Sequence, residues 1–265
     1  MRTRLSSCVE VMDLSWRLFA RTIGAKYRKS FLGYFWMVAP ALFITAGVTL
    51  ASHAGVINPG ATVLPYPLFV LLGTLIWHVF AEAVEVPHLA FEGARSYLTR
   101  VFFPRESIIL SQLFESLITT SVRLLLVLLL LLFTLGADWR AIGWVCLSFY
   151  GTVLLGLGIG SLLMPFTLLF TDLQNSVKLF LTYGLFLTPA MYQPPKGGLF
   201  SVLLQLNPVW PLMSAARDGA AGASLTHPLA VTIALSAAVV MTIAGFLIVR
   251  ASAPIVIERM LLGGR

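Results

Sequence analysis

LLLVLLLLLF, residues 124–133, consists of hydrocarbon side chains only and lies within a longer apolar run from Ser107 to Leu135. A helix at the surface of a soluble protein must present a polar face to water, and this stretch has none. About 20 apolar residues cross a bilayer core, and the chain contains several runs of that length. The composition agrees, because 58% of the 265 residues are hydrophobic and only 11% are charged, against roughly 25% in soluble domains. We therefore predict a polytopic membrane protein.

Six membrane-spanning helices are expected, in one transmembrane domain that covers residues 1–265. The predicted spans are 34–53, 66–85, 111–135, 144–170, 177–193 and 228–250. Gly184 and Pro189 interrupt the fifth span, which is short. Backbone polar groups in lipid must be paired, which leaves helices or a closed barrel, and the two-residue alternation of barrel strands is missing. The predicted fold class is therefore all-α.

The positive charges indicate how the chain is oriented. Most of the 18 Lys and Arg residues fall on one side of the predicted topology: in residues 1–33, in the second–third and fourth–fifth loops, and in the carboxy-terminal tail. Basic loops stay in the cytoplasm, so both termini are predicted to be cytoplasmic, in the inner (plasma) membrane. The net charge of +7 reflects this bias and an attraction to anionic lipid headgroups, and we expect no nucleic-acid partner.

The segment 8–30 has the pattern of an amphipathic helix that lies in the cytoplasmic interface. Its apolar stripe, at spacings of three and four residues, consists of Met12, Trp16, Phe19, Ile23 and Tyr27. Basic residues run beside this stripe, and Asp13 stands four residues before Arg17. Two interpretations stay open: a membrane-surface anchor, or a docking surface that also contacts anionic headgroups.

A second cytoplasmic element is expected after the second span. Pro87 can open a helix and Pro104 can close one, which predicts a short helix over 88–102. Ordinary connections between helices need only a few residues. A loop with its own helix favours a docking role for a cytoplasmic partner, and a solvated connector is the alternative.

The segment 194–213 is too apolar for a free outer loop, and its apolar pieces are too short to span. Pro-Pro, Gly-Gly and Asn-Pro pairs divide it. Short re-entrant helices fit this pattern, because irregular backbone at membrane depth is tolerated where it is buried or lines a cavity. We predict short outer helices between spans five and six, either at the mouth of a pathway or as a packed cap.

The chain lacks the motifs of a catalytic site. It has no phosphate-binding Gly-x-x-x-x-Gly-Lys-Ser/Thr loop, no His-Glu-x-x-His and no Cys-x-x-Cys. We therefore expect no enzyme activity, no metal site and no cofactor on this chain, and any motor must be another polypeptide. Glu82 and Glu85 are expected to pair with the basic first helix. Arg123 lies deeper and should face protein or water, with structural pairing favoured over a transport role.

Several short motifs, in order along nearly the whole chain, resemble those of ABC-2 type permeases that export polysaccharides such as O-antigen, teichoic acid and capsule. They are KYRKSFLGYFW at 26–36 followed by Pro40, VFFPRE at 101–106, TDLQ at 171–174, TPAMY at 188–192 and LNP at 206–208, with Arg217 downstream. No single motif is specific, but the ordered set is. The chain departs from many relatives at Thr171-Asp172, where they carry a basic residue before the Asp.

The resemblance implies a six-helix permease that forms a homodimer and works with two copies of a separate ATPase, which would carry the ATP and Mg²⁺. It assigns residues 8–30 and 88–102 to contact with that ATPase, with Glu92, Arg95 and Arg100 as docking residues. Leu32 and Gly33 resemble the cytoplasmic gate, and 194–213 resembles the periplasmic gate helices.

A lipid-linked polysaccharide combines an anionic phosphate head with a polyhydroxylated tail. The basic residues expected near the head at the cytoplasmic interface are Arg21, Lys26, Arg28 and Lys29. Aromatic rings offer apolar faces to sugar rings, and the candidate channel-lining residues are Tyr34, Trp36, Trp77, Phe80, Tyr183, Phe186 and Tyr192. Trp and Tyr are also enriched in interfacial belts, which is the competing explanation.

Three other functions compete with polysaccharide export. One is an ABC-2 permease for a drug or lipid, which the entry motif and compact outer loops disfavour. A secondary carrier is disfavoured because the chain lacks paired broken helices in two matching halves. A membrane-bound enzyme is disfavoured by the missing catalytic motifs. The sequence names neither the polymer nor its lipid carrier.

Overall fold

A computed structural model describes the chain over residues 2–27, 33–58, 60, 62–98, 106–136, 138–193, 197–198, 204 and 207–262. All regular structure in these ranges is helical. In chain order the elements are α1 (Arg2–Tyr27), the 3₁₀ helix η1 (Gly33–Met37), α2 (Ala39–His53), α3 (Tyr66–Leu98), α4 (Glu106–Leu135), α5 (Trp139–Leu169), α6 (Thr171–Leu187), α8 (Val209–Ala220) and α9 (Pro228–Leu262). The all-α prediction is confirmed.

Four helices are long and apolar enough to cross a membrane: α3, α4, α5 and α9. The helix α2 is apolar but has only 15 residues, and α6 has 17. At about 1.5 Å per residue, each would extend less than the roughly 30 Å of a hydrocarbon core. The structure therefore shows a multi-pass membrane protein with four long helices and two shorter ones, and the count of six spans stays a prediction.

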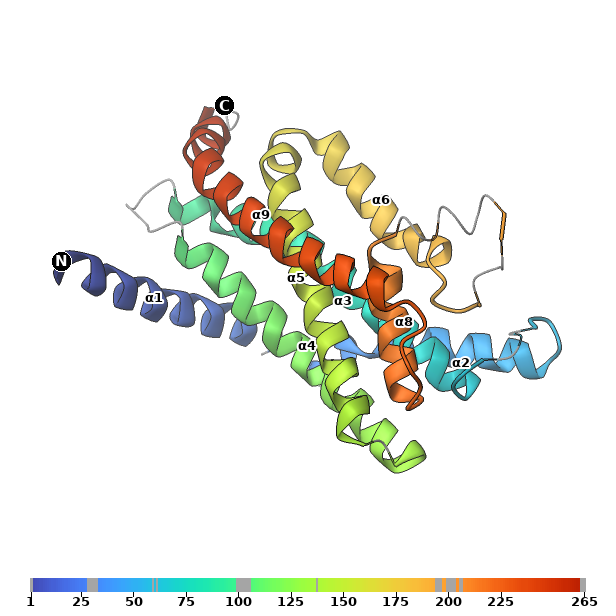
Figure 1. Ribbon diagram of the computed structural model, residues 1–265. Helices are drawn as coiled ribbons and strands as arrows, with labels where there is room; N and C mark the ends of the chain where they lie inside the picture. The colour runs from blue at the N-terminus through green and yellow to red at the C-terminus, as the bar shows by residue number, and fades with distance from the viewer. Residues whose placement is uncertain are drawn as a thin grey trace.

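Helix α5 lies at the centre and packs against α3 on one side and α9 on the other (Figure 1). Glycines make these contacts close. A Cβ at Gly156 would meet Ala83 of α3, and a Cβ at Gly160 would meet the backbone of Val84. On the opposite side, Gly158 is in contact with the backbone of α9. Gly156 and Gly160 form a Gly-x-x-x-Gly pair of the kind that brings helices close together, and side chains on these faces would push the helices apart.

The outer helices show apolar side chains to their surroundings. Only 33% of the apolar span of α4 and 22% of that of α9 is buried, against 72% on α3 and 61% on α5. Leu125, Leu129 and Phe133 of α4 and Val240 and Leu247 of α9 are among the exposed residues. A surface that faces lipid instead of water needs no polar side chains, so these faces are suited to contact with acyl chains.

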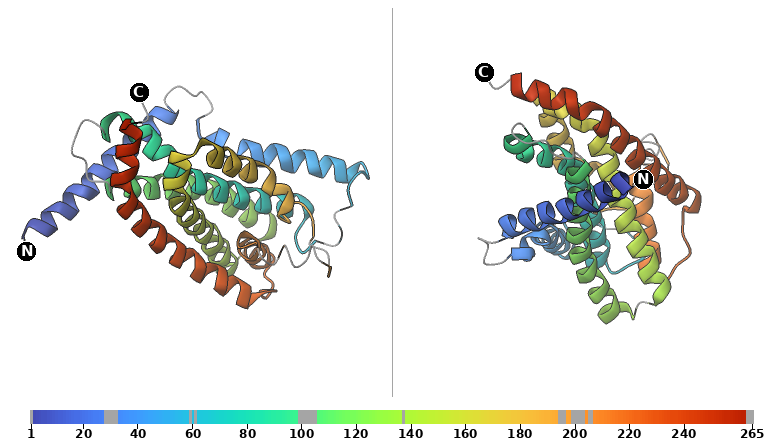
Figure 2. Two further views of the ribbon diagram at one scale, coloured as in Figure 1. Left: turned by 90° about the horizontal axis from the view of Figure 1, so that it is seen from above. Right: turned by 90° about the vertical axis from the view of Figure 1, so that its left-hand side faces the viewer.

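Helix α1 lies along α4, and its amino end projects beyond the bundle (Figures 1 and 2). It starts at Arg2, earlier than the predicted 8–30. Phe19 is buried, and its ring contacts Phe114 of α4 at a centroid distance of 6.3 Å. Trp16 also meets Phe114, but about half of Trp16 stays exposed. The apolar stripe of α1 therefore packs partly on the bundle and is partly open.

The prediction that Pro87 opens a separate helix is wrong. Helix α3 continues through Pro87 to Leu98 as one element of 33 residues. Proline removes one backbone hydrogen bond and its ring crowds the carbonyl four residues earlier, but packing against neighbouring helices in a membrane bundle can offset this cost. Pro87 is buried there. Other boundaries also differ, because the predicted fifth span 177–193 is helical only to Leu187 and α8 begins at Val209. Much of 194–213 lies outside the described residues.

Candidate functional site

A groove of about 350 Å³ runs between α2, α3 and α6, and we call it the α2–α6 groove. Its polar lining consists of His78, Glu82, Glu85, Lys178 and Thr182. Its apolar lining consists of Ile44, Trp77, Ala81, Leu181, Leu185 and Phe186. On α3 and on α6 these positions recur every three to four residues, so each helix presents one face to the groove. A groove with both carboxylates and aromatic rings can accept polyhydroxylated molecules.

Trp77 attaches α6 to α3 at the floor of this groove. Its indole Nε1 donates a hydrogen bond to the Leu181 carbonyl at 3.0 Å. The ring lies against Gly184, where a Cβ would collide with it, and its centroid is 5.4 Å from that of Phe80. Because Gly184 leaves room for the indole, the glycine that interrupts the predicted fifth span serves packing rather than a break in the helix.

Glu82, which lines the groove, forms an ion pair with a buried arginine of α4. The guanidinium of Arg123 on α4 pairs with the carboxylate of Glu82 on α3 and donates from Nε to the Met37 carbonyl of η1 at 3.1 Å. Arg123 is buried, whereas about half of the Glu82 side chain is exposed. The expectation that Arg123 faces protein is confirmed. Glu82 meets this arginine, although we had expected it to pair with the basic first helix.

Arg217 of α8 holds the turn that follows α6. Its guanidinium donates to the carbonyls of Pro189 at 2.9 Å, Ala190 at 2.6 Å and Phe69 at 3.1 Å, and it stacks 3.5 Å above the Phe69 ring. A Cβ at Gly73 would collide with both Ala190 and this guanidinium. The arginine therefore joins α8, α3 and the turn over 188–191 through groups that are buried from solvent.

Two further hydrogen bonds fix the same turn. The Tyr66 hydroxyl of α3 donates to the Met191 carbonyl at 3.0 Å, and the Asn207 amide donates to the Thr188 hydroxyl at 2.8 Å. Thr188 belongs to the TPAMY motif and Asn207 to the LNP motif. These two motifs, which are separated in the sequence, thus meet in space.

The predicted channel-lining aromatics do not gather in one place. Trp77 and Phe80 are buried, whereas Tyr183 and Phe186 are exposed along α6. Among those whose side chains the structure describes, Trp77 and Phe186 line the α2–α6 groove. Trp36 of η1 is exposed beside Phe35, Tyr192 donates to the Phe186 and Leu187 carbonyls, and the backbone of Tyr34 lies in η1.

Most of the predicted headgroup and gate residues are only partly covered by the structure. Arg21 is exposed on α1, and Lys26 is the last residue but one of that helix. Gly33 begins η1 with a φ of 43°, in the left-handed region that favours glycine. Arg28, Lys29 and Leu32 lie outside the described residues.

Of the predicted docking residues, Glu92 and Arg95 lie near the carboxy-terminal end of α3, and Arg100 is beyond the described range. Glu92 is exposed, 3.6 Å from Nε2 of His88. It lines a polar pocket of about 430 Å³ that we call the α3–α9 pocket. The pocket also includes Thr171, Gln174, Asn175, Lys178 and Arg259.

Sequence reasoning missed the part played by Arg217, as well as His78 and Lys178 of the groove. A signal was present for Arg217, since it is the one cation of the mostly apolar segment VWPLMSAARDGA. A lone cation in such a segment needs partners inside the protein. Nothing in the sequence shows that these partners would be three backbone carbonyls.

The helices and buried polar contacts define a polytopic α-helical membrane protein with a polar groove along one face. Known proteins agree with the resemblance drawn from the motifs. The O-antigen export system permease protein RfbA of Myxococcus xanthus is 29% identical over 206 residues, which cover 75% of this chain and 76% of the relative. The protein of the same name from Klebsiella pneumoniae is 24% identical over 217 residues, covering 78% and 80%. No protein-family model matches the chain. The resemblance to polysaccharide-export ABC-2 permeases is thereby confirmed.

Proposed function

We propose that this chain is the permease subunit of an ATP-driven exporter that moves a lipid-linked polysaccharide, O-antigen-like or capsular, across the inner membrane. The observation that carries the proposal is the similarity to two O-antigen export permeases over three quarters of the chain. The sequence has no phosphate-binding loop. ATP and Mg²⁺ therefore belong to a separate ATPase subunit, and this chain supplies the membrane pathway.

In this proposal two copies of the permease assemble with two copies of the ATPase. Each copy crosses the membrane six times, with α2 and α6 as the two shorter spans. The α2–α6 groove forms half of the pathway, and a second copy completes it. The groove combines Trp77 and Phe186 with the polar groups of His78, Glu82 and Lys178. Rings can stack on sugar faces while the polar groups bond hydroxyls, which suits a polymer better than an apolar drug.

The ATPase docks, in this proposal, at the end of the bundle where α3 ends and α6 begins. Glu92 is exposed there beside the α3–α9 pocket, whose Lys178 and Arg259 add positive charge. Arg95 and Arg100 complete the docking residues. Exposed charges of both signs can pair with a soluble subunit, and exchange of the pairs would transmit its movement to α3 and α6.

The lipid-linked head enters, in this proposal, near the junction of α1 and η1. Arg28 and Lys29 just precede Leu32 and Gly33, so a phosphate group from the inner leaflet would meet these cations first. Arginine favours bidentate contacts to phosphate. Neutralising Arg28 and Lys29 should abolish stimulation of the ATPase by lipid-linked substrate while dimerisation and partner binding persist. If stimulation survives, these residues only anchor the chain to the membrane.

The function is tested by deleting the gene in its host and measuring surface polysaccharide and its lipid-linked precursor. We expect the surface polymer to disappear and the lipid-linked polymer to accumulate inside, with both restored by the intact gene. A deletion that leaves surface polymer unchanged but alters drug tolerance or outer lipids would overturn the proposal in favour of a drug or lipid exporter.

The orientation is tested separately with single cysteines at Ser7 and Gly198. An impermeant thiol reagent added to intact cells should label the Gly198→Cys variant and not the Ser7→Cys variant. The reverse pattern would place the termini outside and would contradict the assignment of the docking face.

A further inference from the structure

The α3–α9 pocket lies where α5 ends and α6 begins, beside the carboxy-terminal parts of α3 and α9 (Figure 1). The proposed docking of an ATPase uses exposed charges around this pocket and leaves its interior without a role. The interior has a volume of about 430 Å³ and a mostly polar lining. A ligand of the size of a lipid headgroup fits such a volume.

The amino end of α6 provides hydrogen-bond donors at this pocket. The helix begins at Thr171, which lines the pocket, and the preceding Phe170 supplies no side-chain cap. The first amides of a helix have no acceptor within the helix and carry the positive end of its dipole. Asp172 stands in the same turn, but its carboxylate is not part of the pocket lining. An uncapped helix start of this kind favours an anion.

A buried amide in the same pocket has no hydrogen-bond partner. Nε2 of Gln174 lacks an acceptor in the part of the chain that the structure describes, although the residue is only 6% exposed. Gln174 follows Thr171 by three residues, so both lie on one face of α6, and both line the pocket. Buried donors are nearly always paired, because an unpaired one destabilises the fold. An acceptor oxygen of a bound ligand would satisfy this amide.

The charges of the pocket select an anionic ligand. Two cations line it, Lys178 and Arg259, against one carboxylate, that of Glu92. Glu92 lies 3.6 Å from Nε2 of His88, whereas neither Lys178 nor Arg259 takes part in a salt bridge with another described residue. The excess of positive charge favours an anion, and the guanidinium of an arginine can contact two phosphate oxygens at once.

The position of the pocket along the helices indicates where its ligand comes from. The apolar spans of α3 and α9 end at Ala94 and Val256, and Arg259 follows within one turn of α9. Lipid headgroups lie at the level where apolar spans end. Exposed apolar residues adjoin the pocket: Leu169 lines it, and Ile255 stands one turn before Arg259. In the predicted orientation this end is cytoplasmic, where basic pockets between membrane helices bind anionic headgroups.

We propose that the α3–α9 pocket binds an anionic glycerophospholipid of the phosphatidylglycerol type. The phosphate oxygens accept hydrogen bonds from Arg259, from Gln174 and from the first amides of α6. A hydroxyl of the glycerol head donates to the carboxylate of Glu92, and the acyl chains lie against Leu169 and Ile255. This lipid holds the start of α6 against α3 and α9, and its binding does not depend on the exported substrate.

Other ligands match the pocket less well. A zwitterionic head, as in phosphatidylethanolamine or phosphatidylcholine, leaves the excess positive charge unbalanced. A choline head also has no hydrogen-bond donor for Glu92. A free phosphate ester, or an acidic side chain of a partner protein, would satisfy the cations but would leave Leu169 and Ile255 uncovered. A phosphate diester with hydroxyl groups and acyl chains matches all of these features.

The test is the thermal unfolding of the purified full-length permease in detergent, titrated with phosphatidylglycerol, phosphatidylethanolamine or phosphatidylcholine. We expect phosphatidylglycerol to raise the unfolding temperature most and to be retained in native mass spectrometry. Arg259→Gln and Gln174→Leu should each weaken its apparent affinity about tenfold, because each removes a hydrogen bond to a charged group. Each response is measured relative to the variant's own unfolding temperature.

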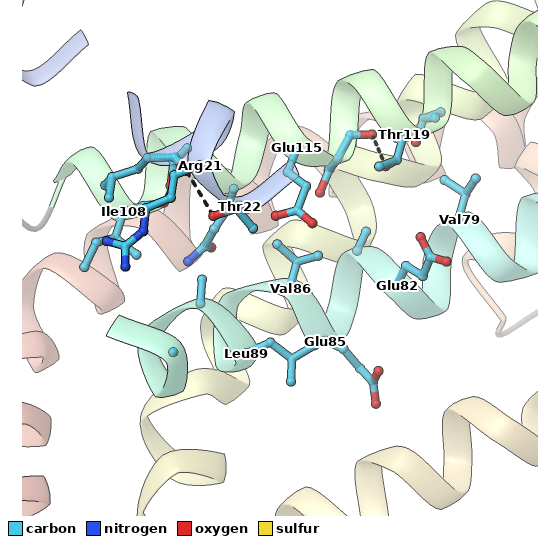
Figure 3. A pocket seen from close by; sticks show the side chains of 18 of the residues that line it. Arg21, Thr22, Val79, Glu82, Glu85, Val86, Leu89, Ile108, Glu115 and Thr119 are labelled. Atoms are coloured by element: carbon cyan, nitrogen blue, oxygen red, sulfur yellow. Dashed lines mark hydrogen bonds between the residues drawn. The ribbon is translucent and has the colours of Figure 1, made fainter. Parts of the chain in front are cut away.

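Arg140→Gln and Gln112→Leu are matched controls. Arg140 is exposed at the start of α5, and Nε2 of Gln112 is also buried without a partner among the described residues. Gln112 lines a different cavity, between α1, α3 and α4, which Figure 3 shows. Both controls should respond to phosphatidylglycerol as the unaltered protein does.

Several results would overturn the proposal. One is an equal response to all three lipids, or no response to any of them. Another is a phosphatidylglycerol response that both Arg259→Gln and Gln174→Leu retain. Competition at the affinity of the lipid by soluble glycerophosphoglycerol would assign the pocket to a free phosphate ester instead. Competition at that affinity by a short glutamate peptide would assign it to an acidic side chain of a partner.

Discussion

Replacing Arg217 with methionine should destabilise the protein more than any substitution of an exposed cation. The guanidinium donates to the carbonyls of Phe69, Pro189 and Ala190, and methionine keeps the volume but removes every donor. Each hydrogen bond to a charged group contributes about 1.5–3 kcal/mol, but removing the arginine also removes its own cost of burial. The net loss expected from breaking such a buried cluster is about 3–5 kcal/mol.

Differential scanning fluorimetry of the purified permease measures this loss. For a domain of about this size, 1 kcal/mol moves the unfolding temperature by roughly 2–4 °C, so we expect a fall of about 6–20 °C. Arg217→Lys should lie between, because one ammonium cannot reach carbonyls on both α3 and the turn after α6. The control is Arg140→Met, an exposed arginine whose guanidinium lies 5.3 Å from the Trp139 ring centroid, which should cost less than about 1 kcal/mol. A fall of under 2 °C for Arg217→Met would refute the view that this arginine joins α8, α3 and the turn.

Three further outcomes follow from packing. Arg123→Gln should lower the free energy of unfolding by about 1.5–3 kcal/mol, the contribution of a hydrogen bond to a charged group, because the Glu82 carboxylate that it leaves behind is about half exposed. The double variant with Glu82→Gln should lose less than the sum of the two single variants, and strict additivity in this double-mutant cycle would show that the two charges are not coupled. Gly160→Ala should lower the free energy of unfolding by about 1–3 kcal/mol, since the added Cβ meets the Val84 backbone. Gly143→Ala in the same helix places its Cβ in open space and should raise the free energy of unfolding by up to about 1 kcal/mol. Equal effects of the two variants on the unfolding temperature would contradict this packing. Trp77→Phe removes the hydrogen bond to the Leu181 carbonyl and should lower the free energy of unfolding by about 1 kcal/mol. It should also loosen α6, which would be measured as faster amide hydrogen exchange in that helix. Unchanged exchange would show that Trp77 does not hold α6 in place.

The helical architecture could be predicted because lipid leaves the chain few choices. The apolar run around 124–133 has no other way to pair its backbone, and α4 covers it as expected. The Gly-x-x-x-Gly spacing of Gly156 and Gly160 is typical of a close helix contact, but it does not show which helix lies opposite. The error at Pro87 came from applying rules for helix ends in water to a buried helix, where packing against neighbours outweighs one missing hydrogen bond.

The candidate site was harder to predict, since its groups come from distant parts of the chain. The Glu82–Arg123 pair joins residues 41 positions apart, and Arg217 reaches Phe69 across 148 positions. Spacing along one helix identifies a face but not the helix that lies opposite. Aromatic residues on α3 and α6 look alike in the sequence, yet Trp77 is buried and Tyr183 is exposed. Only the packing separates a ring that holds two helices together from one that faces outward.

The glycine contacts of α5 also bear on how the molecule can move. Where backbones touch at Gly156, Gly158 and Gly160, no layer of side chains can adjust its rotamers to absorb a shift. We therefore expect α3, α5 and α9 to move as one rigid body. Helix α6 has smaller contacts with α3 and α5 than α5 has with α3 and α9. It can therefore pivot at Phe170, the residue with extended backbone that separates α5 from α6. A change at the α3–α9 pocket would then reach the α2–α6 groove as a tilt of α6.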